Sequence, residues 1–379
     1  MRAAIAGLLA LAVAMGIGRF AFTPILPMMQ DDAGLSVAQG AWLASANYAG
    51  YLIGALWAAR RAIRPGVAIR LALLTIGLAT LGMGLAADFA SWVALRGLAG
   101  IASAWALVHV SSWCLEQLAP LRKPALNGAV FSGVGCGIMV AGGLCLAFMS
   151  LGAGSAHAWL ALGILSLAVA VLVWPILGVN GAAADRLSAG EEKYRWSADA
   201  VRLVLCYGAF GFGYIIPATF VPLMAKQVVR DAAIFGWAWP IFGFTAAAST
   251  LLMAPLLRVL GNRRLWILGA LVMAGGVAGP LMFPGVAGIV LAAVLVGGTF
   301  MVITMAGMQE ARRVAGLHAP VLMAAMTAAF AAGQIIGPLC ASYIAGRGGG
   351  FSAALILACG LLVLSAMALA VNSKGKEKP

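Results

Sequence analysis

Charge is scarce in this sequence. Only 9% of its 379 residues are charged and 63% are hydrophobic, with a mean hydropathy of +1.03. A soluble domain carries about 25% charged residues. The composition therefore excludes a soluble domain and indicates a polytopic membrane protein. The formal net charge of +13 does not indicate nucleic-acid binding, because no basic patch with interleaved aromatic residues lies outside the apolar runs.

Motifs for metals and nucleotides are also lacking. The six cysteines lie inside apolar runs, and neither a Cys-x-x-Cys pair nor a cysteine–histidine cluster with metal-ligand spacing occurs. The glycine-rich runs lack the lysine and the serine or threonine of a phosphate-binding loop. The sequence therefore predicts no metal and no cofactor, and any transport must be driven by gradients of ions or solutes.

Long apolar runs are abundant. Twelve of them have the length of about 20 residues that crosses a bilayer as a helix. We therefore predict an all-α integral membrane protein with twelve transmembrane helices in two pseudo-symmetric six-helix bundles. The runs cover residues 3–29, 37–59, 67–87, 90–117, 125–150, 156–177, 201–225, 232–257, 264–283, 285–309, 318–345 and 351–371.

The longest polar stretch lies between the sixth and seventh runs. It divides the chain into an N-terminal six-helix bundle over 1–178, a cytoplasmic linker over 179–200 and a C-terminal six-helix bundle over 201–379. Weak internal repeats support two related halves: residues 16–19 align with 211–214 at an offset of 195. Duplicated halves are typical of secondary transporters.

Basic residues predict the topology. Of the 24 lysines and arginines, 19 fall on one predicted side, three fall on the other, and two lie within spans. By the positive-inside rule, both termini are then cytoplasmic in a bacterial inner membrane. The 19 are Arg2, Arg60, Arg61, Arg64, Arg70, Arg122, Lys123, Arg186, Lys193, Arg195, Arg202, Arg258, Arg263, Arg264, Arg312, Arg313, Lys374, Lys376 and Lys378.

Twelve spans in two related halves, joined by a basic loop, resemble the major facilitator superfamily. The segment 96–100 of span four is similar to the family's Arg-x-x-x-Gly element, and 333–338 of span eleven to the Gly-x-x-x-Gly-Pro element that its antiporters carry in span five. Two departures stand out. Ile138 replaces that proline in span five, and Ala58 stands where the family has an aspartate after span two.

The opening span is similar to that of the YbfB/YjiJ-type branch of the superfamily. The resemblance implies a permease in which spans one, four, seven and ten line a central cavity and two bundles rock around it. The residues that carry the branch resemblance are Gly16, Ile17, Gly18, Arg19, Phe20, Thr23, Pro24 and Pro27.

Two arginines within the spans are the main candidates for a solute site. An arginine at membrane depth costs several kcal/mol unless it faces a hydrated cavity or a partner. Arg19 and Arg96 differ in predicted depth by only about 6 Å, and the sequence places no carboxylate at that depth. We expect them to share an anionic solute. The alternative is that Arg96 binds backbone carbonyls of span one and Arg19 alone faces the pathway.

Other polar and aromatic residues are candidates to complete the site. Asn47 and Tyr51 share a helical face in span two, and Tyr214 occupies the repeat position of Arg19. For each aromatic residue the alternative is packing or lipid contact. The full set of candidate substrate-binding residues is Arg19, Arg96, Asn47, Tyr48, Tyr51, Tyr214, Trp105, Trp239 and Gln334.

Three further residues are candidates for gating or coupling. His109 and Glu116 lie on one face of span four, and the imidazole titrates in the physiological range, which suits proton coupling; the alternative is a packing histidine. Glu116 and its repeat equivalent Glu310 lie at inner helix ends, where we expect them to pair with cytoplasmic arginines or cap helices.

These patterns predict a monomeric secondary active transporter for a small anionic organic solute, working by alternating access, with protons as candidate partners. The alternative is a proton-coupled exporter of hydrophobic drugs. A membrane enzyme is disfavoured because His109 with Glu116 is the only approach to a catalytic group. A sensor is disfavoured because the spans leave no room for a signalling domain.

Overall fold

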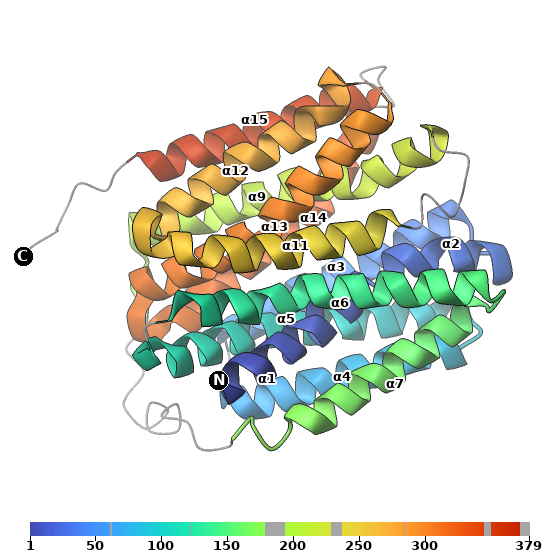
Figure 1. The fold of residues 1–379 in the computed structure, drawn as a ribbon, viewed down its shortest axis with the longest axis horizontal. Helices are drawn as coiled ribbons and strands as arrows, with labels where there is room; N and C mark the ends of the chain where they lie inside the picture. Colours follow the sequence, from blue (N-terminus) through green and yellow to red (C-terminus); the bar gives the residue numbers. More distant parts are fainter. Residues whose placement is uncertain are drawn as a thin grey trace, which may run out of the picture.

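The computed structural model describes residues 1–60, 63–121, 123–178, 194–228, 237–283, 285–344 and 350–371, and these are helical with short connections. In Figure 1 the helices run side by side, and α1 begins at the end of the bundle where α15 finishes. The helices are α1 (Arg2–Leu11), α2 (Phe22–Asp32), α3 (Val37–Arg60), α4 (Pro65–Leu85), α5 (Phe89–Leu118), α6 (Pro124–Ser150), α7 (Ser155–Val173), α9 (Ala198–Val228), α11 (Ala238–Met253), α12 (Leu257–Met282), α13 (Val286–Ala315), α14 (Ala319–Ile344) and α15 (Gly350–Ala370).

Each predicted apolar run corresponds to a crossing of the bundle. The first run contains α1, a π-helical segment and α2, and each other run contains one long helix. By length and hydropathy alone, nine stretches of the described residues could cross a membrane, and one of them, Val286–Ala341, holds both α13 and α14. Most of the predicted linker lies outside the described residues, and α9 starts at Ala198, inside the predicted linker.

The first crossing is broken in its middle, which the apolar pattern did not predict. After α1 the chain forms a π-helix over Ala12–Ile17, with Gly18 donating to the carbonyl of Val13, and α2 begins only at Phe22. Two glycines, Gly16 and Gly18, lie within this break, and glycine is a poor helix former. Pro24 follows in the first turn of α2, where its missing N–H is tolerated. The break therefore leaves backbone carbonyls at membrane depth that need other donors.

Glycines bring backbones together at equivalent places in the two halves. A Cβ on Gly133 of α6 would lie 2.0 Å from the carbonyl oxygen of Leu8, and one on Gly333 of α14 would lie 2.4 Å from that of Gly208. Both residues of the second pair lie 200 positions after those of the first. The predicted repeat thus has a structural counterpart in which span five packs on span one as span eleven packs on span seven.

Substitution at Gly133 tests this packing. Gly133→Ala is expected to lower the melting temperature markedly, since overpacking typically costs 1–3 kcal/mol and the obstacle here is backbone. Gly143→Ala is the matched control, because that glycine lies on the same helix with nothing within 4 Å of its added Cβ. The melting temperatures of the two purified variants give the comparison. Equal melting temperatures would contradict the close packing.

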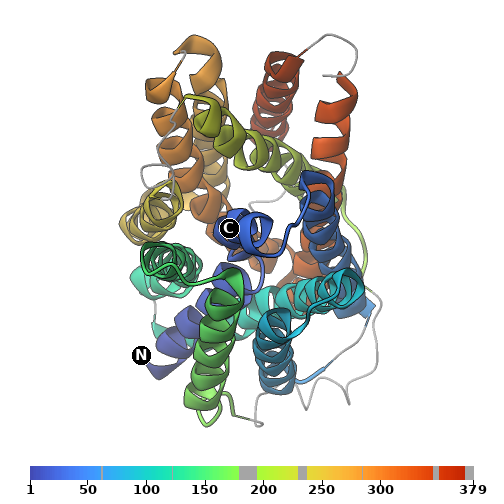
Figure 2. The ribbon, with the colours of Figure 1, turned by 90° about the vertical axis from the view of Figure 1, so that its right-hand side faces the viewer.

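The most extensive contacts between the halves run along two helix pairs, α3 with α14 and α6 with α11. The α6–α11 contact is close, because a Cβ on Gly135 would lie 2.4 Å from the backbone nitrogen of Ala247, and one on Gly243 would lie 2.5 Å from that of Met139. Figure 2 shows this pair, green α6 beside yellow α11, on one flank of the bundle seen end-on. Small residues permit such approach in membranes.

Two aspartates cap helices at the end opposite to the start of α1. Asp32 accepts hydrogen bonds from the backbone N–H of Ser155 and from its hydroxyl (2.9 Å), at the first turn of α7. Asp88 precedes α5 and accepts from the backbone N–H of Ser91 at 2.9 Å. Hydrogen bonds from Ser91 hold the pKa of Asp88 below its usual value. These caps satisfy N–H groups that the helices leave unpaired.

Candidate functional site

Arg19 lies in the break of the first crossing and is buried, with 4% of its surface exposed. Its Nη2 donates to the side-chain carbonyl oxygen of Gln334 at 2.5 Å, across the boundary between the halves. Nε and Nη1 have no hydrogen-bond partner among the described residues. The guanidinium carbon lies 3.8 Å from the centroid of the Tyr51 ring and 5.7 Å from that of Tyr48. Such a cation–π contact stabilises a buried cation but does not neutralise it.

Arg96 has a different environment, although it is equally buried. Its Nη1 and Nη2 donate at 3.2 Å to the carbonyl oxygens of Gly18 and Arg19, respectively. Asn47 also donates to the carbonyls of Gly18 (3.4 Å) and Arg96 (3.0 Å). Two turns along α5, Ser103 donates to the carbonyl of Ala14 at 2.7 Å. The bonds to the carbonyls of Ala14, Gly18 and Arg19 satisfy groups that the broken helix leaves free.

The two arginines therefore meet, but in unlike roles. The hydrogen-bonding groups at the tip of Arg96 are committed to the backbone of span one, which is the arrangement of the packing alternative. Arg96 thereby fixes the backbone that carries Arg19. Arg19 keeps two donors without a partner among the described residues, Nε and Nη1, whereas Arg96 keeps only its Nε, so Arg19 is the better suited of the pair to bind an anion.

Aromatic side chains of the second half lie against this stretch. Phe20, next to Arg19, meets the ring of Phe300 edge-on at 5.6 Å and that of Trp239 at 6.5 Å. Tyr214 stacks on Phe300 at 4.6 Å, is fully buried, and its hydroxyl has no partner in the described part of the chain. The site thus has a cation on one side and an aromatic wall on the other.

Trp105 and His109 lie apart from this group. Trp105 is nine residues beyond Arg96, about 14 Å along α5. Its ring packs against that of Trp57 at 4.8 Å and that of His109 at 6.2 Å. His109 is buried, and its Nε2 has no hydrogen-bond partner among the residues described. Both lie on α5 between Arg96 and the C-terminal end of that helix.

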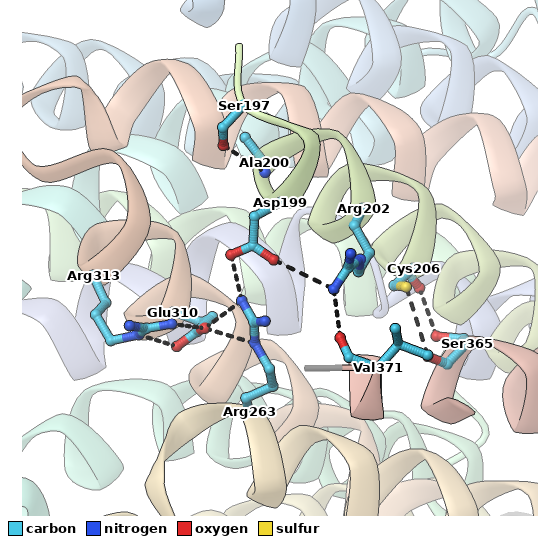
Figure 3. A network of polar contacts seen from close by, with 10 residues as sticks. All are labelled: Ser197, Asp199, Ala200, Arg202, Cys206, Arg263, Glu310, Arg313, Ser365 and Val371. Carbon is cyan, nitrogen blue, oxygen red and sulfur yellow. Dashed lines mark hydrogen bonds and ion pairs between the residues drawn. The ribbon is translucent and has the colours of Figure 1, made fainter. Parts of the chain in front are cut away.

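Glu310 belongs to an ionic network within the second half, drawn in Figure 3. Arg263 donates to Asp199 at 2.7 Å and to Glu310 at 2.9 Å, and Arg313 pairs with Glu310 at 2.7 Å. The Glu310 side chain is only 1% exposed. The predicted pairing of Glu310 with arginines is therefore present, and it links α9, α12 and α13 without crossing to the first half.

A turn presents Arg263 to this network. Gly261 has a φ of +73° inside α12, in the left-handed region that favours glycine. Arg202 extends the cluster, lying 3.8 Å from Asp199 and donating to the carbonyl of Val371 at 2.7 Å. The network therefore also reaches the end of α15.

Glu116 lines a cavity of about 310 Å³ between the halves, near the C-terminal ends of α5 and α13. Ser112 and Glu116 of α5 form one wall, and Arg312, Pro320 and Met323 contribute to the other. Opposite charges from the two halves thus face one space. In the described residues, no group of three histidine, cysteine, aspartate or glutamate side chains could hold a metal ion.

The structure gathers five of the predicted site residues directly: Arg19, Arg96, Asn47, Tyr51 and Gln334. Tyr48, Tyr214 and Trp239 lie at their edge. Sequence reasoning did not select Phe20, Phe300 or Ser103. The position of Ser103, seven residues after Arg96 on the same helix face, was a usable signal, whereas the contact of Phe20 with Phe300 depends on tertiary packing.

A multi-pass helical bundle with a buried cation between its halves is typical of a membrane transporter. A family model described as "Uncharacterised MFS-type transporter YbfB" matches residues 11–370, and the chain belongs to this family of the major facilitator superfamily.

A solved structure agrees on the fold. The crystal structure of the human organic anion transporter MFSD10 (TETRAN) is similar to this chain with a TM-score of 0.72, at 15% identity, over 97% of this chain and 99% of that one. At this identity the likeness shows the major facilitator fold and nothing finer. No curated protein matches the sequence.

Proposed function

We propose that this protein is a secondary active transporter that moves a small organic anion across the inner membrane by alternating access. The observation that carries the proposal is the Arg19 guanidinium, buried between the halves without an ion-pair partner among the described residues. A charge at this depth is costly unless a counter-charge or water compensates it. A solute anion supplies that counter-charge during transport.

The solute site consists of Arg19 with the surrounding tyrosines and the facing wall. Tyr51 and Tyr48 cover the guanidinium, and Tyr214 offers an unpaired hydroxyl from the second half. Arg96 and Asn47 act on the backbone, not on the solute. Organic anions are suited to this setting, because aromatic rings favour contact with the solute's apolar part.

Alternating access requires two rigid halves. We assign them to 1–178 and 201–379, with a linker between them, and they meet along α3–α14 and α6–α11. The hydrogen bond from Arg19 to Gln334 joins the two halves at the solute site. Glu116 and Arg312, on the two sides of the inner cavity, belong to the inner gate, and the Glu310 network stiffens the second half.

The orientation follows from the charges. The basic side of the bundle faces the cytoplasm, so both termini are cytoplasmic, and a monomer suffices because one chain contains both halves. His109 is the candidate for proton coupling, as a buried imidazole with an unpaired Nε2 between the site and the inner cavity.

A thermal-shift screen of the purified protein tests the proposal. Carboxylates, phosphates and cationic drugs are added in turn, and the melting temperature is recorded for each. At least one anion is expected to raise the melting temperature in a concentration-dependent way, because a ligand that binds the folded state stabilises it. Stabilisation by cations alone would contradict an anionic solute.

Export of hydrophobic drugs is the second candidate function. The aromatic wall of Phe20, Phe300 and Trp239 favours it, since such surfaces bind planar apolar compounds. A cationic drug would meet Arg19 as a like charge, and the only fully buried carboxylate among the described residues, Glu310, is bound to arginines. The cationic arm of the screen distinguishes the two functions.

A further inference from the structure

The amide of Gln334 has a defined orientation in the site. A guanidinium carries only donors, so the atom of Gln334 that lies 2.5 Å from Nη2 of Arg19 is the carbonyl oxygen. The amide nitrogen is bonded to the same carbon as this oxygen and therefore lies within about 5 Å of Nη2. Gln334 is fully buried on α14, and its Nε2 has no hydrogen-bond partner among the described residues. The second half thus places an unpaired N–H donor group beside the cation of the first half.

The unpaired polar atoms around this cation are mainly donors. Besides Nε2 of Gln334, they include Nε and Nη1 of Arg19 and Nε of Arg96. Among the described residues of this group, Oδ1 of Asn47 is the one unpaired atom that only accepts, and the hydroxyl of Tyr214 can do both. A buried donor without an acceptor is unfavourable. The solute that fits this site best therefore offers oxygen acceptors in excess of donors.

Arg19 can bind a carboxylate while Gln334 stays in place. Nη2 carries two hydrogens, and the oxygen of Gln334 accepts only one of them. The other hydrogen forms a bidentate edge with an N–H of Nε or of Nη1, both of which are unpaired in the described part of the chain. Once a carboxylate occupies that edge, the N–H groups of Gln334 still need an acceptor. Since they lie beside the guanidinium, that acceptor has to lie beside the carboxylate in the solute.

We propose that the solute is a 2-oxo acid, with its carboxylate on Arg19 and its oxo oxygen on the amide N–H of Gln334. This proposal rests on the proposed function and names its solute class. The oxo group stands on the carbon next to the carboxylate and only accepts, whereas a 2-hydroxy group also brings a donor that needs a partner. A 2-oxo acid is then held by both halves at once, so its binding stabilises the state in which they meet at Arg19 and Gln334.

Dose-dependent thermal shifts of the full-length protein test this inference with matched solutes. The first pair is butyrate and 2-oxobutyrate, and the second is 3-phenylpropanoate and phenylpyruvate. The members of a pair differ only in the oxo group, so the ratio of their midpoint concentrations measures what that group contributes. 2-Hydroxybutyrate and inorganic phosphate complete the set of probes.

Gln334→Met removes the amide from the site and keeps the length of the side chain. Gln309→Met is the matched control, because Gln309 is also partly buried and its Nε2 is likewise unpaired among the residues described, but it lies next to Glu310, outside the site. Gln334→Leu serves if the methionine variant does not fold. A substitution that only displaces Arg19 affects both members of a pair and leaves their ratio unchanged.

The wild type is expected to bind each 2-oxo acid with a midpoint about tenfold lower than that of its parent acid, because one hydrogen bond to the amide contributes about this factor. The ratio should fall to about one in Gln334→Met, since no donor then remains for the oxo oxygen at this position. It should stay near tenfold in Gln309→Met. 2-Hydroxybutyrate should have a higher midpoint than 2-oxobutyrate.

Four results overturn the inference in distinguishable ways. Equal midpoints within both pairs in the wild type, or stabilisation by phosphate alone, remove the 2-oxo acid and leave an anion transporter. A midpoint for 2-hydroxybutyrate at or below that of 2-oxobutyrate contradicts the selection of a pure acceptor. A ratio that persists in Gln334→Met shows that Gln334 does not bind the oxo group. Stabilisation by no anion at all removes the proposed function as well.

Discussion

Arg19→Gln is expected to abolish anion-induced stabilisation and to lower anion uptake by about 100-fold. Removing one member of a buried charge pair typically costs 2–5 kcal/mol of binding, and each 1.4 kcal/mol corresponds to a factor of ten. Arg19→Lys should bind the anion less tightly than the wild type and more tightly than Arg19→Gln, because lysine keeps the charge but loses the planar pair of donors. Binding is measured by thermal shift, and uptake by radiolabelled solute in proteoliposomes.

The unliganded Arg19→Gln protein should melt at the same temperature as the wild type or higher. In the wild type the buried cation has only a neutral amide and aromatic rings around it, and the desolvation of such a charge is unfavourable. Arg264→Gln is the control, since this arginine is exposed. Wild-type anion binding by Arg19→Gln would refute the role assigned to Arg19.

The second large effect is expected at Arg263. Arg263→Ala leaves Asp199 and the buried Glu310 without their shared partner. Breaking a buried pair costs about 3–5 kcal/mol. Because Arg313 still pairs with Glu310 and Arg263 is partly exposed, we expect about 2–3 kcal/mol, seen as a lower melting temperature in detergent.

Arg264→Ala is the matched control for this experiment, as the next residue in the chain with its side chain exposed. Adding Asp199→Asn to Arg263→Ala should recover part of the loss, because the carboxylate that has lost its closest cation is then replaced by a neutral amide. If Arg263→Ala and Arg264→Ala melt alike, the network does not stabilise the second half.

The sequence predicts the helical architecture because each crossing corresponds to a continuous apolar run. The burial of Arg19 follows from its position in such a run, since lipid gives an arginine no alternative to the interior. Helix depth also predicted correctly that Arg19 and Arg96 lie near each other. The depth of a residue along its helix does not predict the direction of its side chain. Arg96 points at backbone carbonyls that are free only because the first crossing is broken.

Contacts between residues of distant helices could not be predicted from the sequence. Gln334 was a candidate for solute binding, but its bond to Arg19 joins residues 315 positions apart and depends on how the halves meet. The repeat related Glu116 to Glu310, yet their surroundings differ. Glu310 lies in an ionic network with Asp199, and the residue 194 positions before Asp199 is Ile5. A duplicated pattern therefore does not guarantee duplicated contacts.

The glycine-lined contact between α6 and α11 has a mechanical consequence. Gly135 and Gly243 approach the facing backbone so closely that no side chain stands between them. Two helices that interlock through side chains can rotate against each other only if those side chains change rotamer. Contacts through glycine backbone do not impose this requirement. The α6–α11 contact is therefore suited to be the hinge axis of the proposed movement. The two halves would tilt about it while the distance between these two helices stays constant.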